Sequence, residues 1–155
     1  MLINPDNVPE TKSTNYPEPF KRLVAGRSKK RLGDAAGLTN FGVNLVKLEP
    51  GSWSSIRHWH LLQDEFIYII QGEVTLVTNA GEQLLKSGNM VGFPAGEADG
   101  HHIINRSDSL VIYLEIGDRT AGDEVTYPDA DLLAHNSSGT WIFTRKDGSN
   151  KDIEH

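Results

Sequence analysis

The stretch Gly51–Gly72, with the sequence GSWSSIRHWHLLQDEFIYIIQG, carries the pattern that decides the fold and the candidate chemistry. Two histidines, His58 and His60, stand one residue apart, and Glu65 follows at the head of an apolar run. Because alternate residues of a β-strand share a face, His58 and His60 are expected to project together while Trp59 points the other way. Two imidazoles and a carboxylate on neighbouring strands make most of a site for a divalent metal.

A second stretch, Gly88–Asn105, has the sequence GNMVGFPAGEADGHHIIN and contains two adjacent histidines, His101 and His102. Either one could complete the set of ligands as a third imidazole. Adjacent residues of a strand face opposite ways, so only one of the two is expected to point inward.

Short β-rich runs, separated by turn residues, recur through the middle of the chain. The predicted strands are 41–48, 52–60, 65–71, 74–78, 83–86, 90–93, 101–105 and 110–116. A strand every ~8–12 residues, with Gly, Pro and Asn between strands, is typical of β-sandwiches and barrels. No helical periodicity of comparable length accompanies these runs. The pattern therefore predicts an all-β fold, an antiparallel β-barrel of jelly-roll type.

The two ends of the chain differ from the predicted barrel core at 40–116. Residues 1–19 are polar and hold four prolines, which favours an extended arm over a helix. Residues 117–155 are polar and acidic, with an expected turn of helix at 131–134 and a last strand at 141–145. This segment is expected to wrap the barrel, to exchange with a second subunit, or simply to pack over an open end. The whole chain, 1–155, is expected to form one domain.

Composition excludes several classes of function. The formal net charge of -6 argues against nucleic acid or an anionic membrane surface as a partner. The absence of cysteine excludes disulfides and thiol chemistry. The N-terminus lacks the pattern of a secretory signal, so a cytoplasmic protein is expected. The one basic cluster, at 29–31, is expected to be a solvated surface patch.

The two histidine-bearing stretches resemble the paired motifs of the cupin superfamily. The first motif, with one extra residue before its first histidine, is matched by Gly51, His58, His60, Glu65 and Gly72. The second, with two extra residues before its histidine, is matched by Gly88, Pro94, Gly96, His101 and Asn105. The resemblance covers roughly residues 40–116, and it implies a double-stranded β-helix, the jelly-roll fold of that superfamily.

The resemblance also implies a set of site residues. The expected metal ligands are His58, His60, Glu65 and His101, and the spacing to Asn105 selects His101 over His102. Three imidazoles and one carboxylate suit a divalent transition metal such as Fe, Mn, Ni or Zn. Glu65 is also the candidate catalytic residue, should it leave the metal.

Strand parity predicts the surroundings of this site. Ile67 and Ile69 share the face of Glu65, and Ile56 that of His58, which predicts an apolar wall. Tyr68 and Tyr113 are possible proton donors, although tyrosines in a sheet more often serve packing.

Two functions follow as hypotheses. The chain is similar to small single-domain bacterial cupins labelled sugar-phosphate isomerases, which implies a metal-dependent enzyme acting on a small oxygenated molecule. A dioxygenase fits the same ligands, and the alternative is a module that binds or senses a metal or small ligand without turnover.

For a phosphorylated sugar a basic pair is expected in the barrel. Lys47 and Arg57 are the candidates, although Arg57 faces away from His58 by parity. A homodimer is expected in either case.

Overall fold

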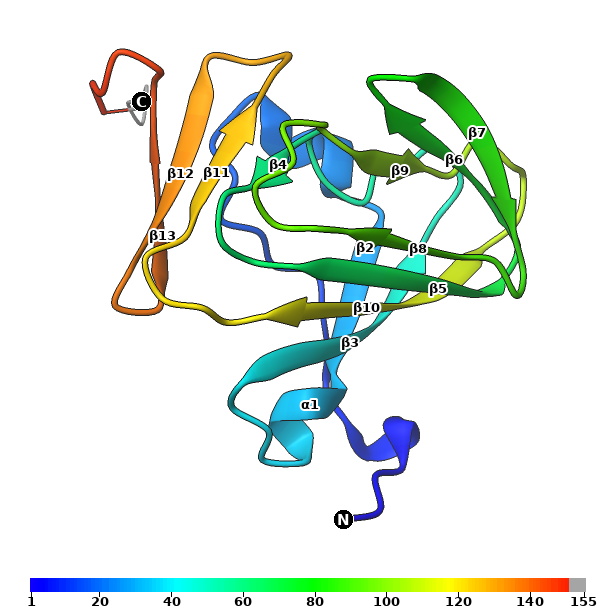
Figure 1. The fold of residues 1–155 in the computed structure, drawn as a ribbon. Coiled ribbons are helices and arrows are strands. Elements are labelled where there is room, and N and C mark those ends of the chain that lie inside the picture. Colours follow the sequence, from blue (N-terminus) through cyan, green and yellow to red (C-terminus); the bar gives the residue numbers. More distant parts are fainter. Residues whose placement is uncertain (151–155) are drawn as a thin grey trace.

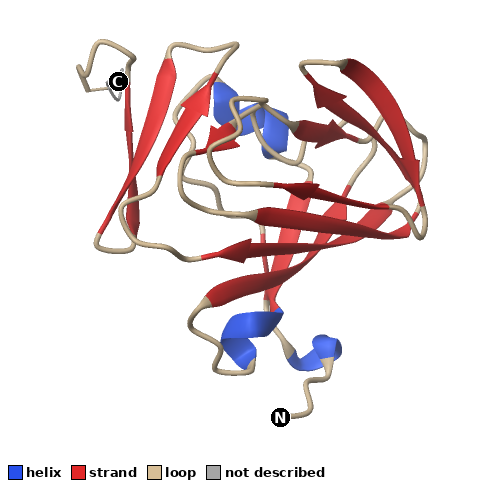
Figure 2. Cartoon of the chain, in the orientation of Figure 1, coloured by secondary structure: helices blue, strands red, loops and turns tan. Residues whose placement is uncertain are grey.

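Antiparallel β-strands are the main regular structure of residues 1–150, the part of the chain that the computed structural model describes (Figures 1 and 2). The helical elements are η1 (Pro5–Asn7), η2 (Phe20–Val24) and α1 (Leu32–Ala35). The strands are β1 (Glu10–Thr11), β2 (Arg27–Arg31), β3 (Phe41–Leu48), β4 (Trp59–His60), β5 (Glu65–Gln71), β6 (Glu73–Thr78), β7 (Gly81–Lys86), β8 (Met90–Phe93), β9 (His102–Ile104), β10 (Val111–Asp118), β11 (Glu124–Tyr127), β12 (Leu132–Ser137) and β13 (Thr140–Thr144). The predicted all-β fold is confirmed. The end of the predicted segment 117–155, with His155, lies outside the described residues.

One wall of the barrel is a six-stranded sheet in the order β1-β2-β3-β10-β5-β8 (Figure 1). Its inner face is apolar at one end, where Val46, Ile69 and Tyr113 are almost completely buried. Along β10 the inward positions alternate with outward ones, as a half-buried strand requires. This sheet therefore supplies both the core and the floor of the cavity described below.

The opposite wall consists of two smaller sheets, β7-β6-β9 and β13-β12-β11-β4. The segment between Gly51 and His58 joins them, because it runs beside the residues around β9. The amide of Gly51 donates to the carbonyl of Asn105 at 2.7 Å, and His58 and His101 exchange two backbone hydrogen bonds. The two histidine-bearing stretches of the sequence thus lie side by side.

Two hydrophobic clusters stabilise this arrangement. The main one fills the barrel between its walls and includes Leu48, Leu76 and Ile103. The second lies between the segment at Ile56 and the sheet of β11 and β12, where Leu132 is fully buried. Burial of such side chains contributes about 1.5–3 kcal/mol each. The second cluster holds the C-terminal strands against the histidine-bearing strand.

Two details of the predicted secondary structure were wrong. The predicted strand at 52–60 is regular only at Trp59–His60; before it, the hydroxyl of Ser54 accepts a hydrogen bond from the amide of Ile103 and breaks the regular ladder. The predicted helical turn at 131–134 is instead the start of β12, which pairs with β11 and β13. The glycines at 51, 72 and 88 occupy turns with positive φ, a conformation that glycine adopts without steric cost.

Among residues 1–150, no helix has the length and apolar character required to cross a membrane.

Candidate metal centre

The four candidate ligands come from three short segments that meet at one end of the barrel cavity. His60 lies on β4, His58 precedes it, and Glu65 is the first residue of β5. The fourth, His101, is held by its two backbone hydrogen bonds to His58. The structure therefore brings together all four residues that the sequence predicted.

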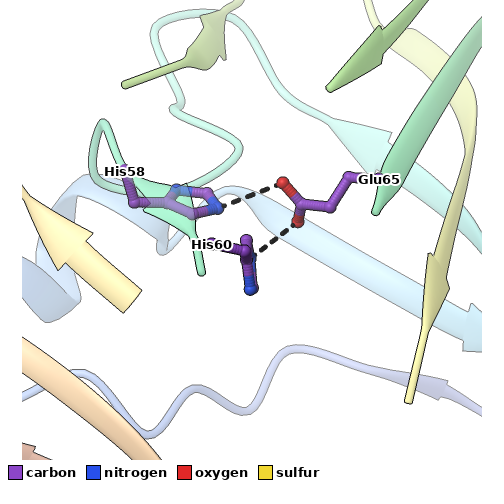
Figure 3. A group of neighbouring side chains, drawn as sticks. All are labelled: His58, His60 and Glu65. Atoms are coloured by element: carbon purple, nitrogen blue, oxygen red, sulfur yellow. Dashed lines mark ion pairs between the residues drawn. The ribbon is translucent and has the colours of Figure 1, made fainter. Parts of the chain in front are cut away.

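Three of these side chains lie close enough to share one ion. The ligand atoms of His58, His60 and Glu65 all lie within 4.8 Å of one another (Figure 3). Nε2 of His60 is 3.1 Å from one oxygen of Glu65, and Nε2 of His58 is 3.5 Å from the other oxygen. His101 reaches the same carboxylate through Nε2, at 2.5 Å. Glu65 is thus surrounded by three imidazole Nε2 atoms.

The far nitrogens of two histidines are already engaged. Nδ1 of His58 lies 2.7 Å from the carbonyl oxygen of Ile56, which can only accept a hydrogen bond. Nδ1 of His60 lies 2.6 Å from a carboxylate oxygen of Asp123, which is completely buried. Both contacts assign a proton to Nδ1, leaving the Nε2 lone pair of each neutral ring free to bind a metal.

His101 and His102 point in different directions, as the parity of a strand predicts. His102 packs edge-on against Trp53, with ring centroids 4.8 Å apart, and its Nδ1 bonds the carbonyl of Ser55. His101 instead stacks flat on Phe93 and faces Glu65. Of the two adjacent histidines, only His101 is directed toward the other candidate ligands.

The electrostatics of the cluster favour an ionised carboxylate. Burial alone would raise the pKa of Glu65, but attraction to His58 and hydrogen bonds from all three imidazoles hold that pKa well below 4.5. Burial alone would lower the pKa of His60, but its hydrogen bonds to Asp123 and Glu65 raise it to about 10. Burial lowers the pKa of His101. Without a metal the cluster therefore holds a proton on His60 beside a carboxylate.

The donor set is compatible with a divalent metal. Imidazole nitrogens and a carboxylate suit transition ions from Mn to Zn, and the Nδ1 contacts of His58 and His60 are the supports that metal-binding imidazoles usually have. A bound cation would replace the proton on His60 and satisfy the charge of Glu65.

The centre opens into a cavity of about 810 Å³ between the barrel walls. Ile67 and Tyr113 line it, as the predicted apolar wall requires, while Ile69 is buried in the core behind them. Ile56 belongs to the second hydrophobic cluster, and Tyr68 lies on the outer face of the sheet, where it pairs with Met90.

The basic residues of the cavity are not those that the sequence suggested. Lys47 pairs with Glu10, and Arg57 forms a two-pronged contact with Asp129; neither lines the cavity. The cluster at 29–31 was predicted to be a surface patch; Lys29 is instead half-buried and lines the cavity, and Arg31 is exposed as predicted but also lines the cavity. The cationic side chains that line the cavity are Arg27, Lys29, Arg31 and Arg119.

Sequence reasoning also missed two carboxylates. Asp123 supports His60 from a segment interpreted only as a C-terminal wrap, and its local sequence carries no signal of the role. Glu115 lines the cavity on β10 and pairs with Lys29 at 3.0 Å. Glu115 is the one charged residue of the predicted strand 110–116, and that exception could have marked it.

Comparison with known proteins agrees with this geometry. The family model described as Cupin domain matches residues 44–117. The chain is 39% identical to a sugar phosphate isomerase of the cupin superfamily from Silicibacter pomeroyi. The TM-score is 0.95, and the match covers 100% of this chain and 99% of that one. A search of curated proteins found no match.

Two further solved structures extend the comparison. A candidate sugar phosphate isomerase from Acidithiobacillus ferrooxidans is 32% identical, with a TM-score of 0.74 over 84% of each chain. The polyketide cyclase RemF from Streptomyces resistomycificus is 16% identical and covers 76% of this chain and 78% of its own, with a TM-score of 0.63. The latter likeness shows the fold alone.

Proposed function

Because this chain belongs to the cupin superfamily, we propose that it is a metal-dependent enzyme that acts on a small oxygenated molecule, of the sugar-phosphate isomerase type. The observation that carries the proposal is the convergence of His58, His60 and Glu65 within 4.8 Å at the end of a cavity. The two relatives above 30% identity bear isomerase names, which favours isomerisation over a dioxygenase reaction.

In this proposal His58, His60, Glu65 and His101 hold the ion. A divalent ion there would supply a Lewis acid that polarises an oxygen atom of the substrate. Asp123 keeps His60 in the tautomer with Nε2 free. The low pKa of Glu65 makes it a ligand in the resting centre, so its service as a catalytic base requires that it first leave its imidazole partners.

In this proposal the side chains of the cavity wall exclude water and provide a hydroxyl group beside the substrate. Ile67 and Tyr113 present apolar surface beside the centre, which limits the water around the reacting carbons. Burial raises the pKa of Tyr113 well above 10, so its phenol stays protonated and interacts with the substrate as a neutral hydroxyl.

The deciding experiment is elemental analysis of protein purified without chelator or nickel resin, beside the His60→Ala variant. Near-stoichiometric Zn or Mn, lost in the variant, supports the proposal and directs assays to isomerisation of sugar phosphates. Fe or Ni directs them to oxygen uptake and would favour the dioxygenase. No metal in either sample, and none taken up on soaking, would leave a small-ligand binding module as the better reading.

We also propose that the protein is a cytoplasmic homodimer. An apolar row on the outer face of the six-stranded sheet supports the dimer. Leu45, Leu114, Tyr68 and Met90 stand opposite one another in a row across four strands. Met90 is 58% exposed, and a continuous apolar face of this kind is usually covered by a partner. Light scattering should give twice the chain mass, and Met90→Lys should reduce it. A monomeric wild-type protein would contradict the dimer.

A further inference from the structure

We infer that Lys29, Arg31 and Arg119 form a subsite for the phosphoryl group of the substrate, on the same six-stranded sheet as Glu65 but toward its β2 side. This inference rests on the proposed function. The reacting end of the substrate would lie at the metal, and the inference places the phosphoryl group at the other end of the same substrate. All three cations line the cavity that contains the candidate ligands.

The basic side chains of strand β2 alternate between the face that lines the cavity and the opposite face of the sheet. Arg27, Lys29 and Arg31 line the cavity, whereas Lys30 between them reaches the carbonyl of Pro5 on the other side. Arg31, at the end of the strand, is exposed. The inward side chains of Lys29 and Arg27 are only partly exposed, so their charges are directed at the cavity rather than at bulk water.

Two glycines, Gly117 and Gly42, lie on the sheet between the candidate metal centre and the cationic side chains. Across the sheet, Glu65 stands opposite Gly117, and Gly117 stands opposite Gly42. A side chain at Gly42 would meet the guanidinium of Arg119, whose Nη2 lies 3.5 Å from the position of its first carbon. Two strand spacings, roughly 10 Å, therefore separate Glu65 from the guanidinium of Arg119. The space between them is open to a small phosphorylated sugar.

Two hydrogen-bond donors at this end have no side-chain partner among residues 1–150. Asn44 lies two residues from Gly42, stands opposite Arg31 on one side and Glu115 on the other, and lines the cavity. Within residues 1–150, neither the guanidinium of Arg31 nor the amide of Asn44 makes a side-chain hydrogen bond or ion pair. Free donors that face a cavity are suited to bind an acceptor supplied by a ligand.

The remaining cations are held in position by carboxylates. Lys29 contacts Glu115, and Arg119 contacts Asp34 while its Nη1 lies 3.5 Å from the carbonyl of Leu38. The cavity is lined by four cationic and four anionic side chains, one of which is Glu65. With a divalent ion bound, the cavity as a whole would be positive inside a chain of net charge -6. An anionic substrate is thus drawn to the cavity and away from the rest of the surface.

The donor geometry favours phosphate over carboxylate. Two planar guanidinium groups and one ammonium present more donors than the two oxygens of a carboxylate can accept. A phosphate monoester has three terminal oxygens and a charge near -2, and so can engage all three cations at once.

The test is a calorimetric titration of the full-length protein with inorganic phosphate at low ionic strength, with and without bound metal. We compare Lys29→Gln and Arg31→Gln with Lys30→Gln, which makes the same charge change on the opposite face of the same strand. Phosphate binding should weaken about tenfold in Lys29→Gln and threefold to tenfold in Arg31→Gln, and should be unchanged in Lys30→Gln. Arg31→Gln leaves no carboxylate unpaired, so it keeps the test valid if Lys29→Gln is poorly folded.

The outcomes separate this inference from the proposed function. Equal weakening in all three variants, or in none, would overturn the subsite. Binding that disappears when metal is removed would place phosphate on the ion and also overturn it, as would equally tight binding of acetate. Phosphate binding that survives in the metal-free wild type and is lost in Arg31→Gln supports the subsite, even if metal analysis refutes the proposed enzyme.

Discussion

His60 and Asp123 are 63 positions apart in the chain, yet Nδ1 of the imidazole lies 2.6 Å from a carboxylate oxygen of the aspartate. The other oxygen of Asp123 accepts a hydrogen bond from the amide of Leu62 at 2.7 Å, so the carboxylate links the ring of His60 to the backbone two residues later. Asp123 is fully buried and has no other charged neighbour within hydrogen-bond distance among the described residues. Its position is therefore determined by the histidine that it supports.

Replacement of Asp123 by asparagine should weaken metal binding about 10- to 100-fold. The neutral amide makes a weaker acceptor for the Nδ1 proton and no longer favours the tautomer with Nε2 free. Competition with a chelating dye measures the affinity. Asp108→Asn, at an exposed turn, is the matched control and should bind metal like the wild type. Equal affinities in the two variants would remove the supporting role of Asp123.

Replacement of His101 by alanine should weaken metal binding, whereas replacement of its neighbour His102 by alanine should not. His101→Ala should reduce metal affinity by more than about 100-fold, since it removes a ligand rather than a support. His102→Ala should keep the metal and lose stability instead, because His102 packs on Trp53. Metal content and melting temperature of the two variants check this assignment. Loss of metal in His102→Ala alone would reverse it.

The stability of the metal-free protein should depend on pH through His60. Its pKa is raised from 6.5 to about 10 by Asp123 and Glu65, so the folded state binds this proton more tightly than the unfolded state does. The resulting stabilisation is fully present below pH 6.5 and is lost as pH rises toward 10. The melting temperature of chelator-treated protein should therefore fall over this range.

Metal-loaded protein serves as the comparison in that measurement. A bound cation replaces the proton on His60, so the loaded protein should lose less of its melting temperature over the same range of pH. Parallel profiles for the two forms would contradict the assignment of the raised pKa to His60.

Glycine at position 72 is required for two reasons that a matched pair of variants separates. Its φ is +87°, and an added Cβ would lie 2.9 Å from Cγ2 of Val111 and 3.1 Å from the carbonyl oxygen of Leu110. Gly88 has a φ of +91° and open space where its Cβ would be. Gly88→Ala should lower the free energy of unfolding by about 1 kcal/mol, and Gly72→Ala by about 2–4 kcal/mol. Chemical denaturation measures both, and equal losses would contradict the contact with Val111.

The sequence allowed the barrel and the four candidate ligands to be predicted because both depend on local rules. Strand alternation placed Glu65 and Ile67 on one face, and the spacing of His58 and His60 placed both toward the cavity. His58 and His60 both line the cavity although their segment is not a regular strand. Backbone hydrogen bonds to His101 on one side, and the pairing of His60 with Val125 on the other, keep them extended.

What the sequence did not reveal depends on contacts distant in the chain. Asp123 acts only because β11 is brought against β4, and no local pattern specifies that pairing. Lys29 and Arg31 were misread for a different reason. Three consecutive basic residues suggest a solvated face, whereas the two-residue period of a strand sends Lys30 one way and its neighbours the other.

Strand β4 has one further consequence. It is only two residues long, and its hydrogen-bonded neighbour is β11, which is joined to it through the pairs His60 with Val125 and Trp59 with Thr126. A ribosome delivers every candidate ligand before it delivers β11, because domains are synthesised from the N-terminus. The nascent chain therefore carries His60 on a strand that still lacks its neighbour. The contact between His60 and Asp123 can form only after the last third of the chain has been synthesised and has docked.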